Sequence, residues 1–126
     1  MRVLHVVTGL DQGGAERQLS NLVNAAACDM SVFTILSPGV MAEEIESAGI
    51  PVYSGYVRHA LSPAWIGALR RTVRMYQPDV VTGWMYHGNL AASLTLRMGH
   101  YGPIIWNVRH SVHDLALEKC TTRWVI

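Results

Sequence analysis

Hydrophobic and polar positions follow two alternating patterns along this chain. Short apolar runs, bounded by glycine, proline, serine or asparagine, alternate with longer stretches in which apolar residues recur at helical spacing. The first run, from Val3 to Val7, is almost continuously apolar, which is typical of a parallel strand buried on both faces. By the same criterion five strands are predicted, over 3–7, 31–36, 50–54, 79–84 and 104–108.

The helical stretches between these runs carry recognisable start and stop signals. Gly49 is placed to end a short second helix, and Ser62-Pro63 is placed to begin the third, which must end before Pro78. Helices are expected to begin at Ala15, just after Gly39, after Pro63, at Asn89 and near Asp114. The residues expected to face the core are Ala15, Leu19, Leu22, Val23 and Ala26, then Met41, Ile45 and Ala48, then Trp65, Ile66, Leu69 and Val73.

Strands that alternate with helices of this length predict a parallel sheet with right-handed crossovers. We therefore expect one α/β domain over residues 1–126, a Rossmann-like three-layer domain with a parallel sheet. The pattern is still helical and apolar on one face from Leu115 to Ile126, which is expected either of a truncated domain or of a short natural one.

Composition narrows the class of protein. Half of the 126 residues are apolar and 15% are charged, which indicates a globular chain rather than a disordered one. A formal net charge of +1 gives no reason to expect a nucleic-acid partner. Cys28 and Cys120 lie far apart without metal-ligand spacing, so we expect reduced thiols and a cytoplasmic protein.

The first candidate site is the glycine loop after the first strand. Gly9, Gly13 and Gly14 precede a helix, where backbone N–H groups and the helix dipole favour an anion. The spacing fits neither the dinucleotide fingerprint nor the Walker loop. Either the glycines only make a sharp turn, or they let a phosphate or sugar approach the backbone, with Glu16 in the first helical turn.

The second candidate is the segment Trp84-Met-Tyr-His-Gly-Asn89 after the fourth strand. Trp84 and Tyr86 offer flat faces for a sugar ring, while His87 and Asn89 can hydrogen-bond hydroxyl groups. In the alternative interpretation Trp84 and Tyr86 belong to the core and Asn89 caps the next helix.

The third candidate follows the fifth strand, where Arg109 and His110 would bring positive charge and proton-transfer capacity. The alternative is a polar surface loop. Because the carboxyl ends of parallel strands share one edge of a sheet, three polar clusters at three such ends predict a binding site.

Two further features of the sequence do not indicate a binding site. His110 and His113 lack the further ligands that a metal needs, so no metal and no cofactor are predicted. Arg70, Arg71 and Arg74 lie on one helix face, which is either solvated or in peripheral contact with the inner face of a membrane.

Together the three segments resemble a known family. Gly13-Gly-Ala-Glu16, Trp84-Met-Tyr-His-Gly-Asn89 and Trp106-Asn-Val-Arg-His-Ser111, in this order, are similar to the N-terminal half of family 4 glycosyltransferases. These are retaining enzymes of the GT-B fold, many of which assemble capsule, O-antigen or exopolysaccharide. The resemblance covers essentially the whole chain.

The resemblance implies two Rossmann-like domains that face each other across a cleft. The N-terminal domain would hold a glycan or lipid-linked acceptor, and the C-terminal domain would hold the nucleotide-sugar, with no metal required. Gly13 and Gly14 would approach the donor phosphates or sugar, His87 would lie near the transferred sugar as the catalytic candidate, and Arg109 and His110 would line the acceptor side.

This chain departs from the family pattern in two respects. The family often has histidines at or near the position of Trp84, and its second domain carries two glutamates eight residues apart, a spacing absent here. The C-terminal nucleotide-sugar domain is therefore expected to be missing, and the fragment alone is expected not to transfer sugar. The alternative is a non-catalytic Rossmann-like module that binds a nucleotide or phosphosugar.

Overall fold

The computed structural model describes residues 1–10, 14–25, 28–58 and 62–107, except the side chains of 14–16 and 24. Strands and helices alternate strictly until the last helix, which a short 3₁₀ turn extends. In chain order the elements are β1 (Arg2–Val7), α1 (Gly14–Ala25), β2 (Asp29–Leu36), α2 (Val40–Ser47), β3 (Val52–Val57), α3 (Ala64–Tyr76), β4 (Val80–Trp84), α4 (Met85–Leu94), η1 (Thr95–Met98) and β5 (Ile104–Asn107).

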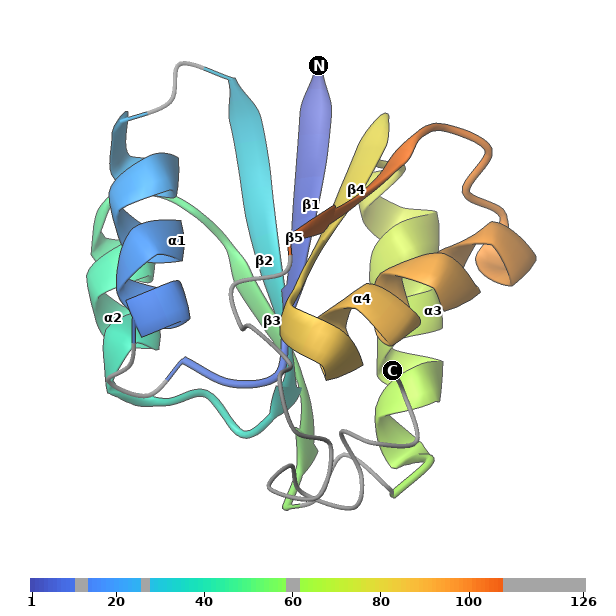
Figure 1. Cartoon of the computed structure of the whole chain (residues 1–126), viewed down its shortest axis with the longest axis horizontal. Helices are drawn as coiled ribbons and strands as arrows, with labels where there is room; N and C mark the ends of the chain where they lie inside the picture. The colour runs from blue at the N-terminus through green and yellow to red at the C-terminus, as the bar shows by residue number, and fades with distance from the viewer. Residues whose placement is uncertain (11–13, 26–27, 59–61, 108–126) are drawn as a thin grey trace, which may run out of the picture.

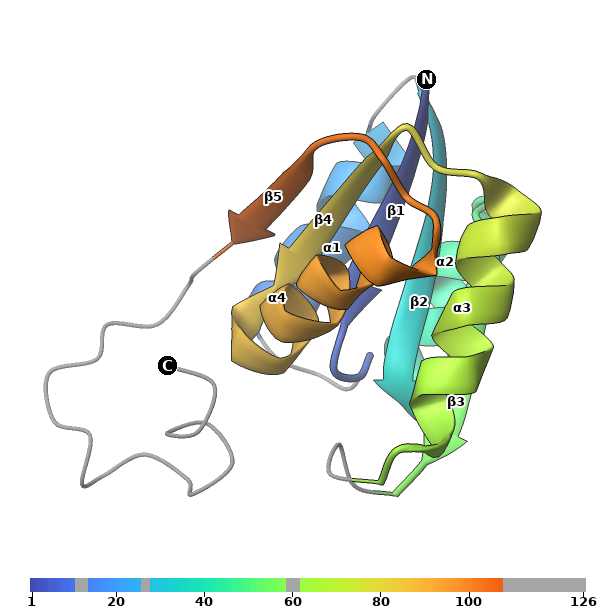
Figure 2. The ribbon, with the colours of Figure 1, turned by 90° about the vertical axis from the view of Figure 1, so that its right-hand side faces the viewer.

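The strands form one sheet of five, in the order β3-β2-β1-β4-β5, and every neighbouring pair is parallel. Helices α1 and α2 cover one face of the sheet, and α3 and α4 cover the other (Figure 1). This is a three-layer, Rossmann-like α/β domain, as the sequence predicts. The carboxyl ends of all five strands lie at one edge, at the end of the sheet away from the N-terminus (Figure 2).

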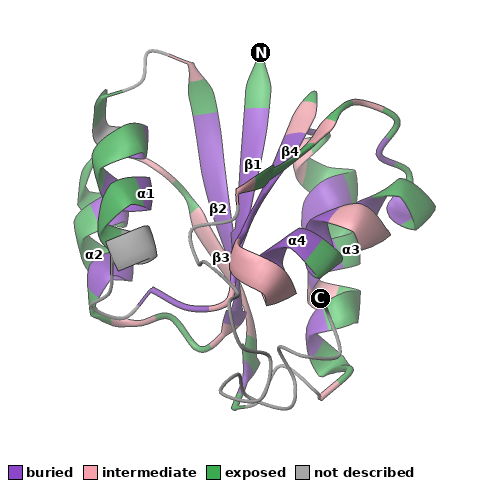
Figure 3. Ribbon diagram, viewed as in Figure 1, coloured by how far each residue is buried: buried purple, intermediate pink, exposed green. Residues whose placement is uncertain are grey.

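The core consists of one apolar layer on each side of the sheet, which Figure 3 shows as buried strands beneath helices that are exposed on their outer faces. Alternating strand residues face the two layers, as the period of two requires. On the α1 side Val3 and Val7 pack with Leu19, Val23, Met41 and Ile45. On the α3 side Leu4 and Val6 pack with Trp65, Leu69, Val73 and Ala91.

The predicted boundaries hold to within one residue except at three elements, of which β2 begins at Asp29, two residues before its predicted start. Strand β3 begins at Val52, directly after Pro51, and continues to Val57, which pairs with Leu36 of β2 after a register shift. The fourth helix begins at Met85, four residues before the predicted start at Asn89. Its first turn has no side-chain cap, so the usual start signal is absent. The predicted helix near Asp114 lies outside the described residues.

Three residues predicted to face the core are exposed instead. Each helix buries only a narrow stripe of its residues. Leu22 and Ile66 lie beside this stripe, with 43% and 38% of their surface exposed. Ala48 caps the end of α2 and is also exposed. Gly49 follows with a φ of +85°, which confirms the predicted glycine stop.

The first turn of α4 packs directly on the backbone of the sheet. A Cβ atom at Gly88 would lie 2.6 Å from the carbonyl oxygen of Val6 in β1. At Gly83 in β4, a Cβ atom would lie 2.6 Å from the Cα of Asn89. Both distances are too short for real carbon atoms, so only glycine allows α4 to approach β1 and β4 this closely.

This packing predicts opposite effects for alanine at two helical glycines. Gly88→Ala should lower the free energy of unfolding by about 1–3 kcal/mol, because the methyl group meets backbone that cannot move aside. The matched control is Gly67→Ala in α3, where a Cβ atom meets nothing within 4 Å. Alanine there should raise stability by about 0.5–1 kcal/mol. Urea denaturation measures both, and equal effects at the two sites would contradict the packing.

Candidate functional site

The sheet has a topological switch point between β1 and β4. From β1 the chain moves to β2 and β3 on one side, then crosses through α3 to β4 on the other. In open α/β sheets ligands bind outside the carboxyl ends of the strands at such a point. We call the segments there the switch-point edge: residues 8–10 after β1, Gly14 at the start of α1, and residues 85–89 at the start of α4.

Helix α1 begins at Gly14, at the switch-point edge. Its first-turn N–H groups lack carbonyl partners within the helix and carry the positive end of its dipole. Of the predicted residues of the glycine loop, Gly14 therefore lies at the edge. Gly13 lies outside the described residues, and the backbone of Glu16 is in the first turn of α1, where its side chain is not described.

Trp84 ends β4 and is buried, with 2% of its surface exposed. Its indole ring belongs to the apolar layer beneath α1 and α2, and its Nε1–H donates a hydrogen bond to Nδ1 of His5 at 3.1 Å. This position agrees with the core interpretation of Trp84. A face buried in this way does not stack on a sugar ring.

His5 is buried in the middle of β1, where its backbone pairs with Val32 on one side and Thr82 on the other. Burial lowers the pKa of its imidazole from 6.5 to about 4, because the charged form is poorly solvated there. The ring is therefore neutral near pH 7. With Nδ1 accepting from the indole, the proton lies on Nε2, which has no hydrogen-bond partner among the described residues.

Tyr86 and His87 lie in the first turn of α4 and are half-buried, as Figure 3 shows for this turn. Burial lowers the pKa of His87 below its usual value of 6.5. A neutral imidazole both donates and accepts hydrogen bonds, and the tyrosine hydroxyl does the same. These two residues can therefore hydrogen-bond sugar hydroxyls or phosphate oxygens at the switch-point edge.

The junction between β4 and α4 is strained. Trp84 has an extended backbone, and Met85 follows with a φ of +62°, in the left-handed region that non-glycine residues rarely adopt. One residue thus turns the chain from strand to helix. Strain of this kind persists where surrounding contacts hold it, and it is concentrated at functional sites. Sequence reasoning missed both Met85 and the link from His5 to Trp84, because neither follows from periodicity.

Asn89 lies one turn inside α4 and is buried, so the alternative interpretation, in which it caps the helix, is wrong. Its Nδ2 donates to the carbonyl oxygen of Asn107 at 3.4 Å, which links α4 to the end of β5. Its Oδ1 has no hydrogen-bond partner within the described part of the chain. The early helix start explains the error, because it moves Asn89 from the helix end to the packed interface with Gly83.

The third predicted cluster begins at the end of β5. Trp106 is 60% exposed, and its Nε1–H donates to Oγ of Ser93 in α4 at 3.1 Å. Arg109, His110 and His113 lie outside the described residues, so their predicted roles stay predictions. Within the described ranges no three histidine, cysteine or acidic side chains are close enough to hold a metal ion.

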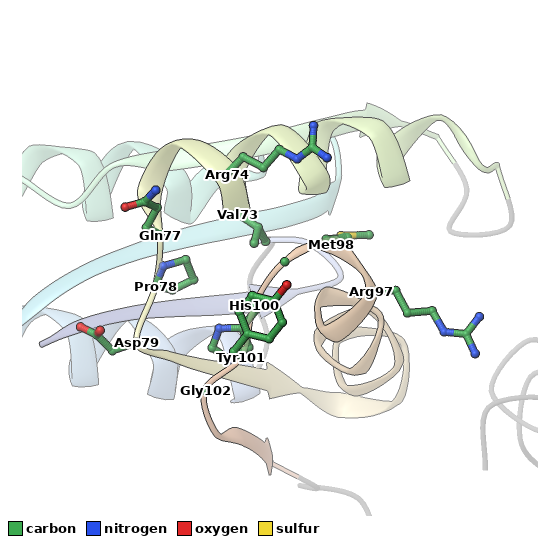
Figure 4. Close-up of a pocket in the computed structure, with 11 residues that line it drawn as sticks. Val73, Arg74, Gln77, Pro78, Asp79, Arg97, Met98, His100, Tyr101 and Gly102 are labelled. Atoms are coloured by element: carbon green, nitrogen blue, oxygen red, sulfur yellow. The ribbon is translucent and has the colours of Figure 1, made fainter.

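A hollow of about 760 Å³ lies at the opposite edge of the sheet, between the end of α3 and the segment that joins η1 to β5. Figure 4 shows His100 and Tyr101 inside it, while the guanidinium groups of Arg74 and Arg97 extend away from both. Asp79 accepts a hydrogen bond from the backbone N–H of Arg2 at 2.8 Å. Because its cations do not converge, this hollow lacks the features of an anion site.

Helix α3 exposes all three of its predicted surface arginines, Arg70, Arg71 and Arg74. Exposure is required both of a solvated helix face and of one that contacts a membrane. No helix in the described ranges has the length and apolar content needed to cross a membrane.

Neither a family model nor a curated protein matches this chain.

The burial of His5 predicts a pH-dependent stability. The folded-state pKa lies below the unfolded value, so between pH 6.5 and about 4 the unfolded state binds more protons. The free energy of unfolding should therefore fall as pH falls through this window, by about 3 kcal/mol from His5 alone. The contribution of His5 is read as the difference between wild type and His5→Leu, because all other groups are the same in the two proteins. Parallel pH profiles of urea denaturation for the two proteins would contradict a buried neutral His5.

Proposed function

We propose that this chain is the acceptor-binding, N-terminal domain of a retaining glycosyltransferase that acts in polysaccharide biosynthesis. One observation carries the proposal: Tyr86 and His87 lie half-buried in the first turn of α4, at the switch point beside the end of β1. The three sequence segments that resemble family 4 glycosyltransferases follow β1, β4 and β5, whose carboxyl ends share this edge. A second domain of the complete protein would bind the nucleotide-sugar.

In this proposal the switch-point edge recognises the reacting sugars by hydrogen bonding. His87 stays neutral near pH 7 and lies close to the transferred sugar, where its ring nitrogens can hold a hydroxyl group. Tyr86 adds a hydroxyl and an aromatic face beside it. The N–H groups at the start of α1, at Gly14, face the donor phosphates.

Catalysis would rest on positioning the two sugars and stabilising the charge of the departing nucleotide phosphate. We assign this charge to backbone amides at the glycine loop and to cationic side chains, and we assign Arg109 and His110 to the acceptor side. The scheme needs no metal ion. It also requires the donor-binding domain, so the described domain alone binds ligand without turnover.

A transfer assay on the complete protein tests the proposal. His87→Ala should lower kcat for transfer from a nucleotide-sugar, tested with UDP-glucose, UDP-galactose and GDP-mannose, by about 100-fold. The control is Tyr101→Ala, which changes a side chain with 93% of its surface exposed at the opposite edge and should leave the rate unchanged.

Two outcomes would overturn the assignment. Equal rates for wild type and His87→Ala would remove His87 from the reaction. If the complete protein bound these nucleotide-sugars but never released or transferred the sugar, the domain would be a non-catalytic nucleotide or phosphosugar binding module instead.

A further inference from the structure

A histidine in the central strand of a parallel sheet is an unusual core residue. His5 has apolar neighbours on its own face of β1, Val3 and Val7, and 2% of its surface is exposed. Its Nε2–H has no partner among the described residues, and an unpaired buried donor costs free energy. An apolar side chain of similar size would avoid this cost, so the imidazole must contribute through its other nitrogen.

That other nitrogen accepts the indole N–H of Trp84. The Nε1 to Nδ1 distance is 3.1 Å, and the two rings are tilted by 51° with their centroids 6.1 Å apart. The bond joins β1 to the last residue of β4, the two strands that flank the switch point. It lies in a buried, apolar layer, where a hydrogen bond is stronger and more directional than in water.

The position of Trp84 decides where the next three residues go. Met85 turns the chain with a φ of +62°, and Tyr86 and His87 follow in the first turn of α4. Gly88 then rests on the backbone of Val6, so the turn is held from both of its ends. The bond to His5 therefore restrains the residue directly before the strained junction that leads to Tyr86 and His87.

We propose that His5 is a positioning residue of the switch-point edge: by accepting the indole N–H of Trp84, it fixes the direction in which the chain leaves β4 and hence the placement of Tyr86 and His87. His5 touches no ligand in this proposal. The effect on geometry stands on the structure alone, whereas the effect on sugar transfer rests on the proposed function.

A matched pair of substitutions separates the hydrogen bond from packing. Asparagine and leucine have the same branched shape, and asparagine oxygen can occupy the position of Nδ1 whereas leucine has no acceptor. In the full-length protein, His5→Leu should move the Trp84 indole N–H resonance upfield and shift the amide resonances of Met85, Tyr86 and His87. His5→Asn should keep these resonances close to those of wild type. Trp84→Phe assigns the indole signal.

Two controls make this comparison specific. Ile45→Val removes one methyl group from α2 in the same apolar layer as His5 but leaves the hydrogen bond in place, so it should leave these resonances close to those of wild type. Adding His5→Leu to Trp84→Phe should produce no further shift at Met85 to His87, because the bond is already absent. If His5→Leu and His5→Asn shift these resonances equally, or neither does, His5 has no positioning role.

Transfer assays give the second, independent result. His5→Leu should lower kcat/KM for sugar transfer by about tenfold through misplaced side chains, and His5→Asn should recover most of that loss. Equal activity of the two variants would overturn the catalytic consequence. If the wild-type protein transfers no sugar from any donor tested, the proposed function fails, while the resonances of Met85 to His87 still decide the role of His5.

Discussion

The close approach of the α4 backbone to the backbones of β1 and β4 determines how the rest of the switch-point edge is arranged. Gly88 of α4 rests on the carbonyl oxygen of Val6, and Gly83 of β4 accommodates the backbone of Asn89. A side chain at Gly88 would push α4 away from β1, and one at Gly83 would push it away from β4. Because α4 is held against both strands, its first turn stays at the switch point, directly beside the end of β1. The edge is thus built from backbone contacts, with polar side chains added at its rim.

The strained junction at Met85 is a consequence of this packing. Helix α4 follows β4 with no loop between them, so the chain turns from strand to helix within one residue. A φ of +62° at Met85 achieves this turn at an energetic cost. The buried bond between His5 and Trp84 lies on one side of that junction, and the glycine contact lies on the other. Tyr86 and His87 therefore lie between two residues held in place by their contacts, Trp84 and Gly88. A binding edge needs this rigidity, because small displacements of its polar groups weaken recognition and catalysis.

Much of this architecture could be predicted from local sequence. Alternation of apolar runs and helical stripes gives the strands, the helices and a parallel sheet, because each signal depends on burial of neighbouring residues. The start of α4 could not be predicted, since Met85 has a backbone conformation that its residue type disfavours and no capping side chain marks it. That error misplaced Asn89 at a helix end. The link from His5 to Trp84 joins residues 79 positions apart and depends on strand order, which no local pattern contains.

Under the proposed function, ligand binds at the switch-point edge and not at the hollow on the opposite edge. Amide resonances of the isotope-labelled protein, followed during titration with a nucleotide-sugar and with a short-chain prenyl-diphosphate-linked sugar, test this most directly. We expect the shifts to concentrate at residues 8–10, at Gly14 and at residues 85–89. Shifts confined to the hollow around His100 and Tyr101, with none at these segments, would contradict it.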